Sequence, residues 1–371
     1  MALLKKLFWI LLAAVLIFLL GISAFLFIQK DFIRNQSIKS LNKQLNTEID
    51  VAGPIDLSFL SNFPNISLSF NDVIIADRLR TNDTLASLGN VRLNLNTWAL
   101  LNKDVSIDGI NARDGFIHLY TDKQGLANYN ILKPKESSSA STLLQLKSIV
   151  LNNVELIYDD EENNIKTVTF SGECYGKRGQ LRRGTIVITY SETRNEVGSF
   201  RQVEYSDFYM NDVKIEGTRR SEILTIDENG NRTTQTTHSG GKMIYEDGTF
   251  KTRESAMTRY VHFENDKKTY STLSGSKSGI STKGVEFSME ITTPIKFVYD
   301  CLSTGERKRG KVPVEGIKVT TNEDELISTD FGDGTCDTLL EVTKDGEVET
   351  LDLKDIKRGE RFKNILKRKK K

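Results

Sequence analysis

The chain begins with an uninterrupted apolar run, and most of the remaining sequence alternates between apolar and polar residues. Residues 7–28 contain no charged side chain over a length of 22 residues. As a helix, such a run would be about 33 Å long, which matches the hydrocarbon core of a bilayer. The sequence therefore predicts a single-pass membrane anchor, and its representative residues are Leu7, Trp9, Phe18 and Ile28.

The two ends of this run bear on its processing and its orientation. A cleaved signal peptide is the competing interpretation, because small residues at 21–24 could form a cleavage site. The run continues to Ile28, and signal peptides usually have shorter apolar cores, so we favour an uncleaved anchor. Lys5 and Lys6 precede the run and favour a cytoplasmic amino terminus, although basic residues also follow it closely.

Beyond the anchor, apolar residues recur at every second position, which is the period of a β-strand with one buried face. The clearest runs in the first half are residues 66–70, 91–95, 105–107 and 116–120. The whole chain has only 5 prolines, and Gly, Asn, Asp, Ser and Thr separate the apolar runs. This composition is typical of strands and turns, so we expect a mostly β protein.

Several segments of the first half carry a family resemblance. They are 53–59, 63–73, 88–95, 105–110, 114–117 and 125–128, all after the apolar run. In this order they resemble the amino-terminal region of the AsmA family, over residues 1–170. The resemblance implies a curved antiparallel sheet, an inner-membrane anchor and a periplasmic body. It also implies a role in outer-membrane biogenesis and lipid traffic, as in the AsmA proteins of Gram-negative bacteria.

The apolar face of these strands must be shielded from water. A closed protein core and an open groove that holds lipid acyl chains are the two alternatives, and the family resemblance raises the second. The candidate groove residues are Ile66, Leu68, Phe70, Val91, Leu93, Leu95, Ile107 and Phe116.

The second half, residues 172–353, has a different character, with many Thr, Arg, Glu and Gly residues between its apolar positions. We expect a second all-β domain of the sandwich type. Segments such as 182–190, 211–219 and 330–337 are similar to a family of exported lipoproteins of unknown function from Gram-negative bacteria. The predicted organisation is a cytoplasmic stub and anchor at 1–30, an AsmA-like β domain at 31–170, the lipoprotein-like domain at 172–353 and a basic tail at 354–371.

The 3 cysteines lie far apart and form no metal-binding pair. If the body is exported, one disulfide and one spare thiol are expected. We favour a Cys301–Cys336 bond, because both residues adjoin predicted strands that could be neighbours. A Cys174–Cys336 bond is the alternative, and no bond is expected in the cytosol.

Catalytic and metal-binding motifs are weak in this sequence. The 3 histidines have no partner acid or cysteine at motif spacing, and no serine lies in a Gly-x-Ser-x-Gly motif. Residues 330–332 read Asp-Phe-Gly, but the other kinase motifs are missing. Asp330, Asp333 and Asp337 lack the spacing of a calcium loop, so a Gly-rich turn is favoured. We therefore expect a protein that is not an enzyme and has neither a cofactor nor a metal.

The carboxyl-terminal tail concentrates positive charge. It holds ten Lys or Arg residues and only two acidic residues, Asp355 and Glu360. Its last five residues, Lys367, Arg368, Lys369, Lys370 and Lys371, are candidates for contact with anionic head groups. A solubilising, disordered tail is an equal alternative.

These features together predict an inner-membrane-anchored periplasmic protein that holds or transfers lipid in an apolar β groove. Its expected partners are the membrane, a phospholipid or another envelope lipid, and envelope proteins, and nucleic acid is not expected. The alternative is a non-catalytic envelope scaffold or binding module with closed β-sandwich domains.

Overall fold

The computed structural model describes residues 42, 45–58, 66–95, 107–131, 133, 148–176, 178–299, 301, 311–323 and 325–353. The predicted anchor, residues 7–28, and the basic tail, residues 354–371, both lie outside the described residues. Within the described ranges, no helix has the length and apolar character needed to cross a bilayer. Nearly all regular structure in these ranges is β-strand, as the sequence predicts.

The chain divides into two compact units, and strand β7 contributes to both. The first unit comprises Met1–Asn163 and Val168–Cys174, and the second comprises Asn164–Thr167 and Tyr175–Lys371. The domain boundary predicted between residues 170 and 172 falls inside β7. The first unit contains β1 (Ile49–Val51), β2 (Ile55–Ser58), β3 (Ile66–Ala76), β4 (Thr84–Leu95), β5 (Ile107–Thr121), β6 (Ser148–Asp160) and most of β7 (Ile165–Tyr175).

The sheet of the first unit is antiparallel except at one pair of strands. Strands β1 and β2 both pair with β3, β3 pairs with β4, and β4 pairs with β5, all antiparallel. Strands β5 and β6 are parallel, with Gly109 opposite Ser148 and Thr121 opposite Asp160. A parallel pair needs a crossover connection, and residues 122–147 provide its length.

A line of irregular residues crosses this sheet. Asp72, Asp114, Asn153 and Gly172 have φ angles of 52°, 58°, 55° and 81°, in the left-handed region. The register places Asp114 beside Asn153, whose Nδ2 donates a hydrogen bond of 3.0 Å to the Asp114 carboxylate. Each reverses the side-chain alternation of its own strand, and the register of β3–β6 runs across this line without a shift. We call these four residues the bulge line.

The bulge line keeps the apolar side chains on one face. On β3, apolar positions change from even to odd numbers across Asp72, yet Phe70 and Val73 belong to one buried cluster. On β6, Leu151 and Val154 likewise pack in one cluster on either side of Asn153. Without this reversal, each strand would turn half of its apolar side chains to the opposite face.

At Gly115, next to the bulge line, β5 approaches the backbone of β4 closely, and a substitution can test how much this approach matters. A Cβ atom at this position would lie 1.9 Å from the carbonyl oxygen of Ser87 on β4. We expect Gly115→Ala to lower the free energy of unfolding by about 3 kcal/mol or more, because backbone must move. Gly125→Ala is the control, since its Cβ would lie 3.5 Å from Glu162 and only its positive φ, at about 1–2 kcal/mol, opposes the change. Equal losses in a urea titration would contradict the packing argument.

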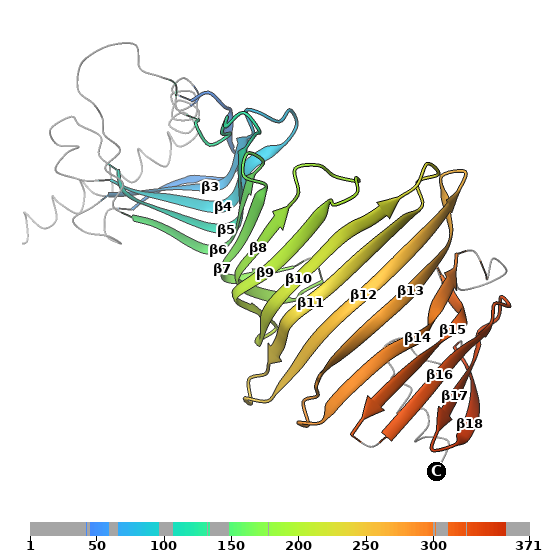
Figure 1. Cartoon of the computed structure of the whole chain (residues 1–371). Coiled ribbons are helices and arrows are strands. Elements are labelled where there is room, and N and C mark those ends of the chain that lie inside the picture. Colours follow the sequence, from blue (N-terminus) through green and yellow to red (C-terminus); the bar gives the residue numbers. More distant parts are fainter. Residues whose placement is uncertain are drawn as a thin grey trace, which may run out of the picture. The chain divides into compact units, whose positions relative to one another are not determined.

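The second unit is a single antiparallel meander rather than the predicted sandwich. Each of its strands pairs with the next along the chain, from β8–β9 to β17–β18 (Figure 1). The strands are β8 (Leu181–Tyr190), β9 (Phe200–Met210), β10 (Val213–Ile226), β11 (Arg232–Ile244), β12 (Phe250–Glu264), β13 (Lys267–Ile280), β14 (Glu286–Val298), β15 (Val312–Asn322), β16 (Glu325–Asp333), β17 (Leu339–Lys344) and β18 (Glu347–Asp352). A sandwich strand needs one apolar face that packs against a second sheet. Strand β11 has none over residues 232–238, whose sequence is Arg-Thr-Thr-Gln-Thr-Thr-His.

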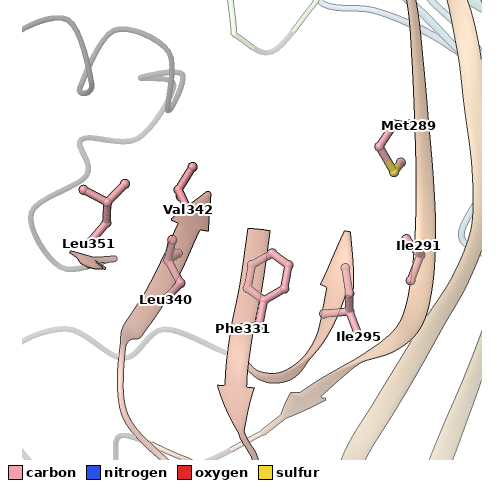
Figure 2. Close-up of a cluster of buried hydrophobic side chains, with 7 residues drawn as sticks. All are labelled: Met289, Ile291, Ile295, Phe331, Leu340, Val342 and Leu351. Atoms are coloured by element: carbon pink, nitrogen blue, oxygen red, sulfur yellow. The ribbon is translucent and has the colours of Figure 1, made fainter. Parts of the chain in front are cut away.

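The apolar core of the second unit lies among its last strands. Figure 2 shows the seven buried side chains of this cluster, which come from β14, β16, β17 and β18. Leu340 and Leu351 face each other across β17 and β18, and both are almost inaccessible to solvent. The cluster members are Met289, Ile291, Ile295, Phe331, Leu340, Val342 and Leu351.

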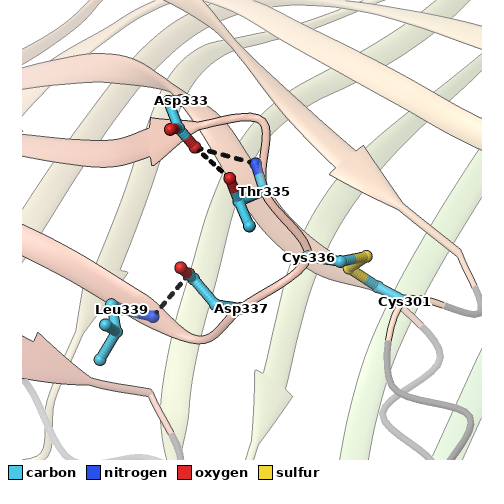
Figure 3. The surroundings of a disulfide bond; sticks show 6 residues. All are labelled: Cys301, Asp333, Thr335, Cys336, Asp337 and Leu339. Atoms are coloured by element: carbon cyan, nitrogen blue, oxygen red, sulfur yellow. Dashed lines mark hydrogen bonds between the residues drawn. A yellow bond between two sulfur atoms is a disulfide. The ribbon is translucent and has the colours of Figure 1, made fainter.

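A disulfide bond joins Cys301 and Cys336, the pair favoured from the sequence, with 5.4 Å between the Cα atoms (Figure 3). It connects the segment after β14 to the turn between β16 and β17, across 35 residues of chain. Cys174, the alternative partner, is buried, and its thiol donates a hydrogen bond of 3.6 Å to the Ser171 carbonyl oxygen.

Reduction should therefore weaken the second unit. A bond that closes a loop of this length stabilises a fold by about 3–4 kcal/mol. We expect dithiothreitol to lower the unfolding midpoint of the native chain, and the Cys301→Ser/Cys336→Ser variant to start lower and show no further loss. Cys174→Ala should keep the full response to reductant. A native chain whose midpoint ignores reductant would refute the stabilising role of the bond.

Candidate functional site

The apolar face of β3–β6 is built from side chains in cross-strand register. One row consists of Phe70, Val91, Ala112 and Leu151, which pair in turn across the four strands. The next row toward the strand ends consists of Leu68, Leu93, Ile110 and Ile149. We call this second set the outer apolar row.

Exposure increases from the bulge line to the outer apolar row. Next to the bulge line, Val154 is 0% exposed and Leu88 is 6% exposed. In the outer apolar row, Leu68, Leu93 and Ile110 are half-buried, and Ile149 is 61% exposed. The face therefore has a covered apolar floor and an apolar edge that is half-buried on β3–β5 and open to solvent at Ile149 on β6.

The structure brings together most of the predicted groove residues. Leu68, Phe70, Val91 and Leu93 occupy neighbouring positions of the apolar face. Ile66 lies opposite Leu95 in the same register, and Leu95 lies opposite Ile107 after a register shift between Asn94 and Leu95.

Phe116 is the exception, because it projects from the opposite face of the sheet. It pairs with Ser87, while its neighbour Gly115 pairs with Leu88 of the apolar face. The bulge at Asp114 has reversed the alternation that otherwise joins position 116 to Ile110 and Ala112. Sequence reasoning also missed Ile110 and Ile149, which become neighbours only through the parallel pairing of β5 with β6.

A polar cluster closes the other end of the apolar face, where β3 turns into β4. The Asp77 side chain is fully buried and forms an ion pair of 2.7 Å with Arg80. Its carboxylate also accepts hydrogen bonds from the Leu79 backbone and from Asn128 Nδ2, of 2.8 Å and 2.9 Å. Asn128 is fully buried and accepts a bond of 2.8 Å from the backbone of Tyr120, so it ties β5 to this turn. We call this group the Asp77 cluster.

Two titrating groups in the Asp77 cluster have shifted pKa values. Burial acts to raise the pKa of Asp77, but the hydrogen bonds from Asn128, Leu79 and Arg80 outweigh it and hold the pKa below its usual value. Burial, together with a hydrogen bond to Glu161, raises the pKa of Tyr120 to about 12. Arg80 stacks over the Tyr120 ring at 4.5 Å. Both groups keep one charge state across the neutral range, which suits a structural role.

The histidines and the aspartates of the Gly-rich turn are held by local partners. His118 Nε2 lies 3.9 Å from Asp159, and His238 Nδ1 lies 2.9 Å from the Ser255 hydroxyl. His262 Nδ1 lies 2.8 Å from the hydroxyl of Thr269. In the described ranges, no three His, Cys, Asp or Glu side chains gather as metal ligands would.

The three aspartates of residues 330–337 each fix a turn. Asp333 accepts hydrogen bonds from the Thr335 backbone and hydroxyl, of 3.0 Å and 2.5 Å, and Asp337 accepts one of 3.0 Å from the backbone of Leu339 (Figure 3). Asp330 accepts one of 2.9 Å from Gly332. Aspartates commonly stabilise turns in this way, so these carboxylates stabilise the backbone conformation at the end of β16 and in the turn before β17.

Comparison with known proteins identifies the first unit. The family model described as "AsmA family" matches residues 1–189 of the 371-residue chain. The chain belongs to the AsmA family. No curated protein matches it, and no solved structure matches it. The matched region of this AsmA protein contains the whole apolar face of β3–β6 and the Asp77 cluster. Membership of this family points to a function in the cell envelope.

The Asp77 cluster should give the first unit a distinctive acid sensitivity. Because the folded-state pKa of Asp77 is depressed, its stabilising contribution is present above the unfolded-state pKa and is lost as pH falls through the folded-state value. We expect Asp77→Asn to lower the unfolding free energy at pH 7 by about 2–3 kcal/mol, because the buried Arg80 pair is broken. The variant should also show a shallower loss of stability on acidification.

Asp83→Asn is the control for this experiment. Asp83 contacts the same Arg80 guanidinium at 3.1 Å, but its side chain is 46% exposed. An exposed pair contributes little, so Asp83→Asn should change stability by less than about 1 kcal/mol. If both variants behaved alike in thermal unfolding from pH 3 to pH 7, burial would not be the cause.

Proposed function

We propose that this AsmA-family protein is anchored in the inner membrane and holds or transfers lipid on the apolar face of β3–β6. Its body then lies in the periplasm, and its role in envelope biogenesis is non-catalytic. The observation that carries the proposal is the change along this face from a buried apolar floor to the outer apolar row, which is half-buried on β3–β5 and exposed at Ile149. A lipid acyl chain can cover the outer apolar row in the same way that protein covers the floor.

The dimensions of the face support this role. The outer apolar row crosses the four neighbouring strands β3–β6 and is about 14 Å long at about 4.8 Å per strand spacing. One leaflet of a bilayer offers an acyl layer of about 15 Å, half of a core of about 30 Å. The outer apolar row is therefore long enough to contact one acyl chain laid across the strands. Burial of apolar surface would supply the binding energy, at about 25 cal/mol per Å².

The polar residues of the same strands lie on the opposite face, so they do not interrupt the apolar path. Arg92 donates a hydrogen bond of 3.2 Å to Ser69, and Ser67 bonds Asn94 at 3.0 Å. These contacts satisfy the polar groups among themselves. An acyl chain on the apolar face would therefore lie away from these polar groups.

Lipid carriage can be tested by purifying the full chain in a mild non-ionic detergent and measuring bound phospholipid by mass spectrometry. We expect about one lipid per chain, and we expect Ile149→Asn to reduce it several-fold, because it places a polar amide in the outer apolar row. Val150→Asn is the matched control, since Val150 is the next residue on β6, lies on the opposite face and is 44% exposed.

The result also separates carriage from a scaffold role. A stable native chain without lipid would reject carriage and leave a non-catalytic envelope scaffold. Equal lipid loss in the Ile149→Asn and Val150→Asn variants would mean that the outer apolar row is not the lipid contact.

A further inference from the structure

One face of β10–β15 in the second unit gathers cationic side chains. In the register, Arg219 pairs with His238, His238 with Ser255, and Ser255 with Lys277. On β12, Arg253 and Arg259 lie two and four residues from Ser255 and therefore share its face. We call Arg219, His238, Arg253, Arg259 and Lys277 the basic face.

Carboxylates are sorted to the opposite face of the same strands. Glu222, Glu254 and Glu290 each stand one residue away from a position of the basic face, at Ser221, Ser255 and Met289. There, Glu222 forms an ion pair of 2.9 Å with Arg220, and Glu254 accepts a hydrogen bond of 2.7 Å from the Gly240 backbone. None of the ion pairs among the described residues involves Arg219, Arg253 or Arg259. These three carboxylates therefore lie on the face opposite the basic face.

Electrostatics indicate that the cations of the basic face influence one another. Burial lowers the pKa of His238, and the positive charges of Arg253 and Arg219 lower it further. Burial also lowers the pKa of Lys318 on β15, with Lys277 adding to the effect. In contrast, the pKa of Lys214 is raised, because it bonds Glu216 and Asp207. Arg219 and Arg253 thus hold their positive charges close to His238, and a cationic surface of this kind favours an anionic ligand.

The basic face also has apolar neighbours in the same register. Met257 pairs with Gly275, which pairs with Ile291, and Leu273 pairs with Ile295. Met257 and Leu273 are half-buried and pack against the apolar cluster of β14–β18 shown in Figure 2. A ligand on this face would therefore meet cations over β10–β13 and apolar side chains toward β14. An amphiphile with an anionic head group has this distribution, whereas a polyanion without an apolar part would leave the apolar side uncovered.

We propose that the basic face of the second unit binds an amphiphile through its anionic head group, with its apolar part against Met257 and Leu273. The site lies beyond residue 189, outside the part matched by the family model, and it is separate from the outer apolar row. It selects ligands by charge, because Arg219 and Arg253 are exposed and can bond phosphate oxygens directly. A zwitterionic head group would bring a positive charge to the same cations and bind more weakly.

Photo-crosslinking can test this site in the full chain. Diazirine-labelled phosphatidylglycerol and phosphatidylcholine with identical acyl chains are offered separately in non-ionic detergent, and labelled peptides are mapped by mass spectrometry. We expect phosphatidylglycerol to label β10–β15 peptides about tenfold more than phosphatidylcholine, equivalent to about 1.4 kcal/mol. Raising the salt to 1 M, where the Debye length is about 3 Å, should remove most of this preference.

Variants on the two faces of the same strands provide the control. Arg219→Gln/Arg253→Gln should lower phosphatidylglycerol labelling of β10–β15 by about tenfold. Arg220→Gln/Lys242→Gln removes two cations from the opposite face, where Glu222 and Glu216 accompany them, and should leave it unchanged. If the first variant unfolds, Lys277→Gln and the salt titration measure the same charge dependence.

Two outcomes would overturn the proposal. One is equal labelling of β10–β15 by the two lipids, and the other is equal loss in the two double variants. Ile149→Asn should not affect labelling of the second unit, so failure of the basic face and failure of the outer apolar row are distinguishable.

Discussion

The side-chain period of a β-strand is the constraint on which the rest of this protein depends. A shift of one residue turns every following side chain to the other face, so a long strand keeps an apolar face only if each such reversal is matched by its neighbours. In the first unit the match is the bulge line, where Asp72, Asp114, Asn153 and Gly172 follow one another across the sheet. The bonds from Asn153 to Asp114 and from Glu173 to Asn153 hold these reversals in step. The apolar face of β3–β6 exists because all of its strands shift at the same line.

The same rule separates charge in the second unit. Neighbouring residues such as Arg219 and Arg220 point to opposite faces, and only Arg220 meets a carboxylate on its own face. A single-layer meander exposes both of its faces, so each can acquire a separate character. One face carries the Arg220–Glu222 ion pair of β10, and the other combines cations with the apolar cluster of β14–β18.

Alternating apolar residues were sufficient to predict the β class, parts of β3, β4 and β5, and four neighbouring side chains of the apolar face, although the separate runs 105–107 and 116–120 fall within or beside the single strand β5. They were insufficient at Phe116, because a strict period of two ignores the bulge at Asp114. Ile149 was missed for another reason: its neighbours depend on the parallel pairing of β5 and β6, and no local pattern encodes that partner. The length of the connection at 122–147 was the available signal, since parallel strands require a long crossover. The sandwich was wrong because residues 232–238 are polar at every position, and a sandwich strand needs one dry face.

The accessibility of the three cysteines also has a consequence for how the correct bond is chosen. Cys174 is only 6% exposed, whereas Cys336 is exposed at its turn. Thiolate exchange needs direct attack on sulfur, so a thiol enclosed by its own domain cannot compete. Once residues 168–174 have folded into the first unit, Cys301 is the remaining partner for Cys336. Burial of Cys174 within its own unit therefore disfavours the Cys174–Cys336 bond without any contribution from the second unit.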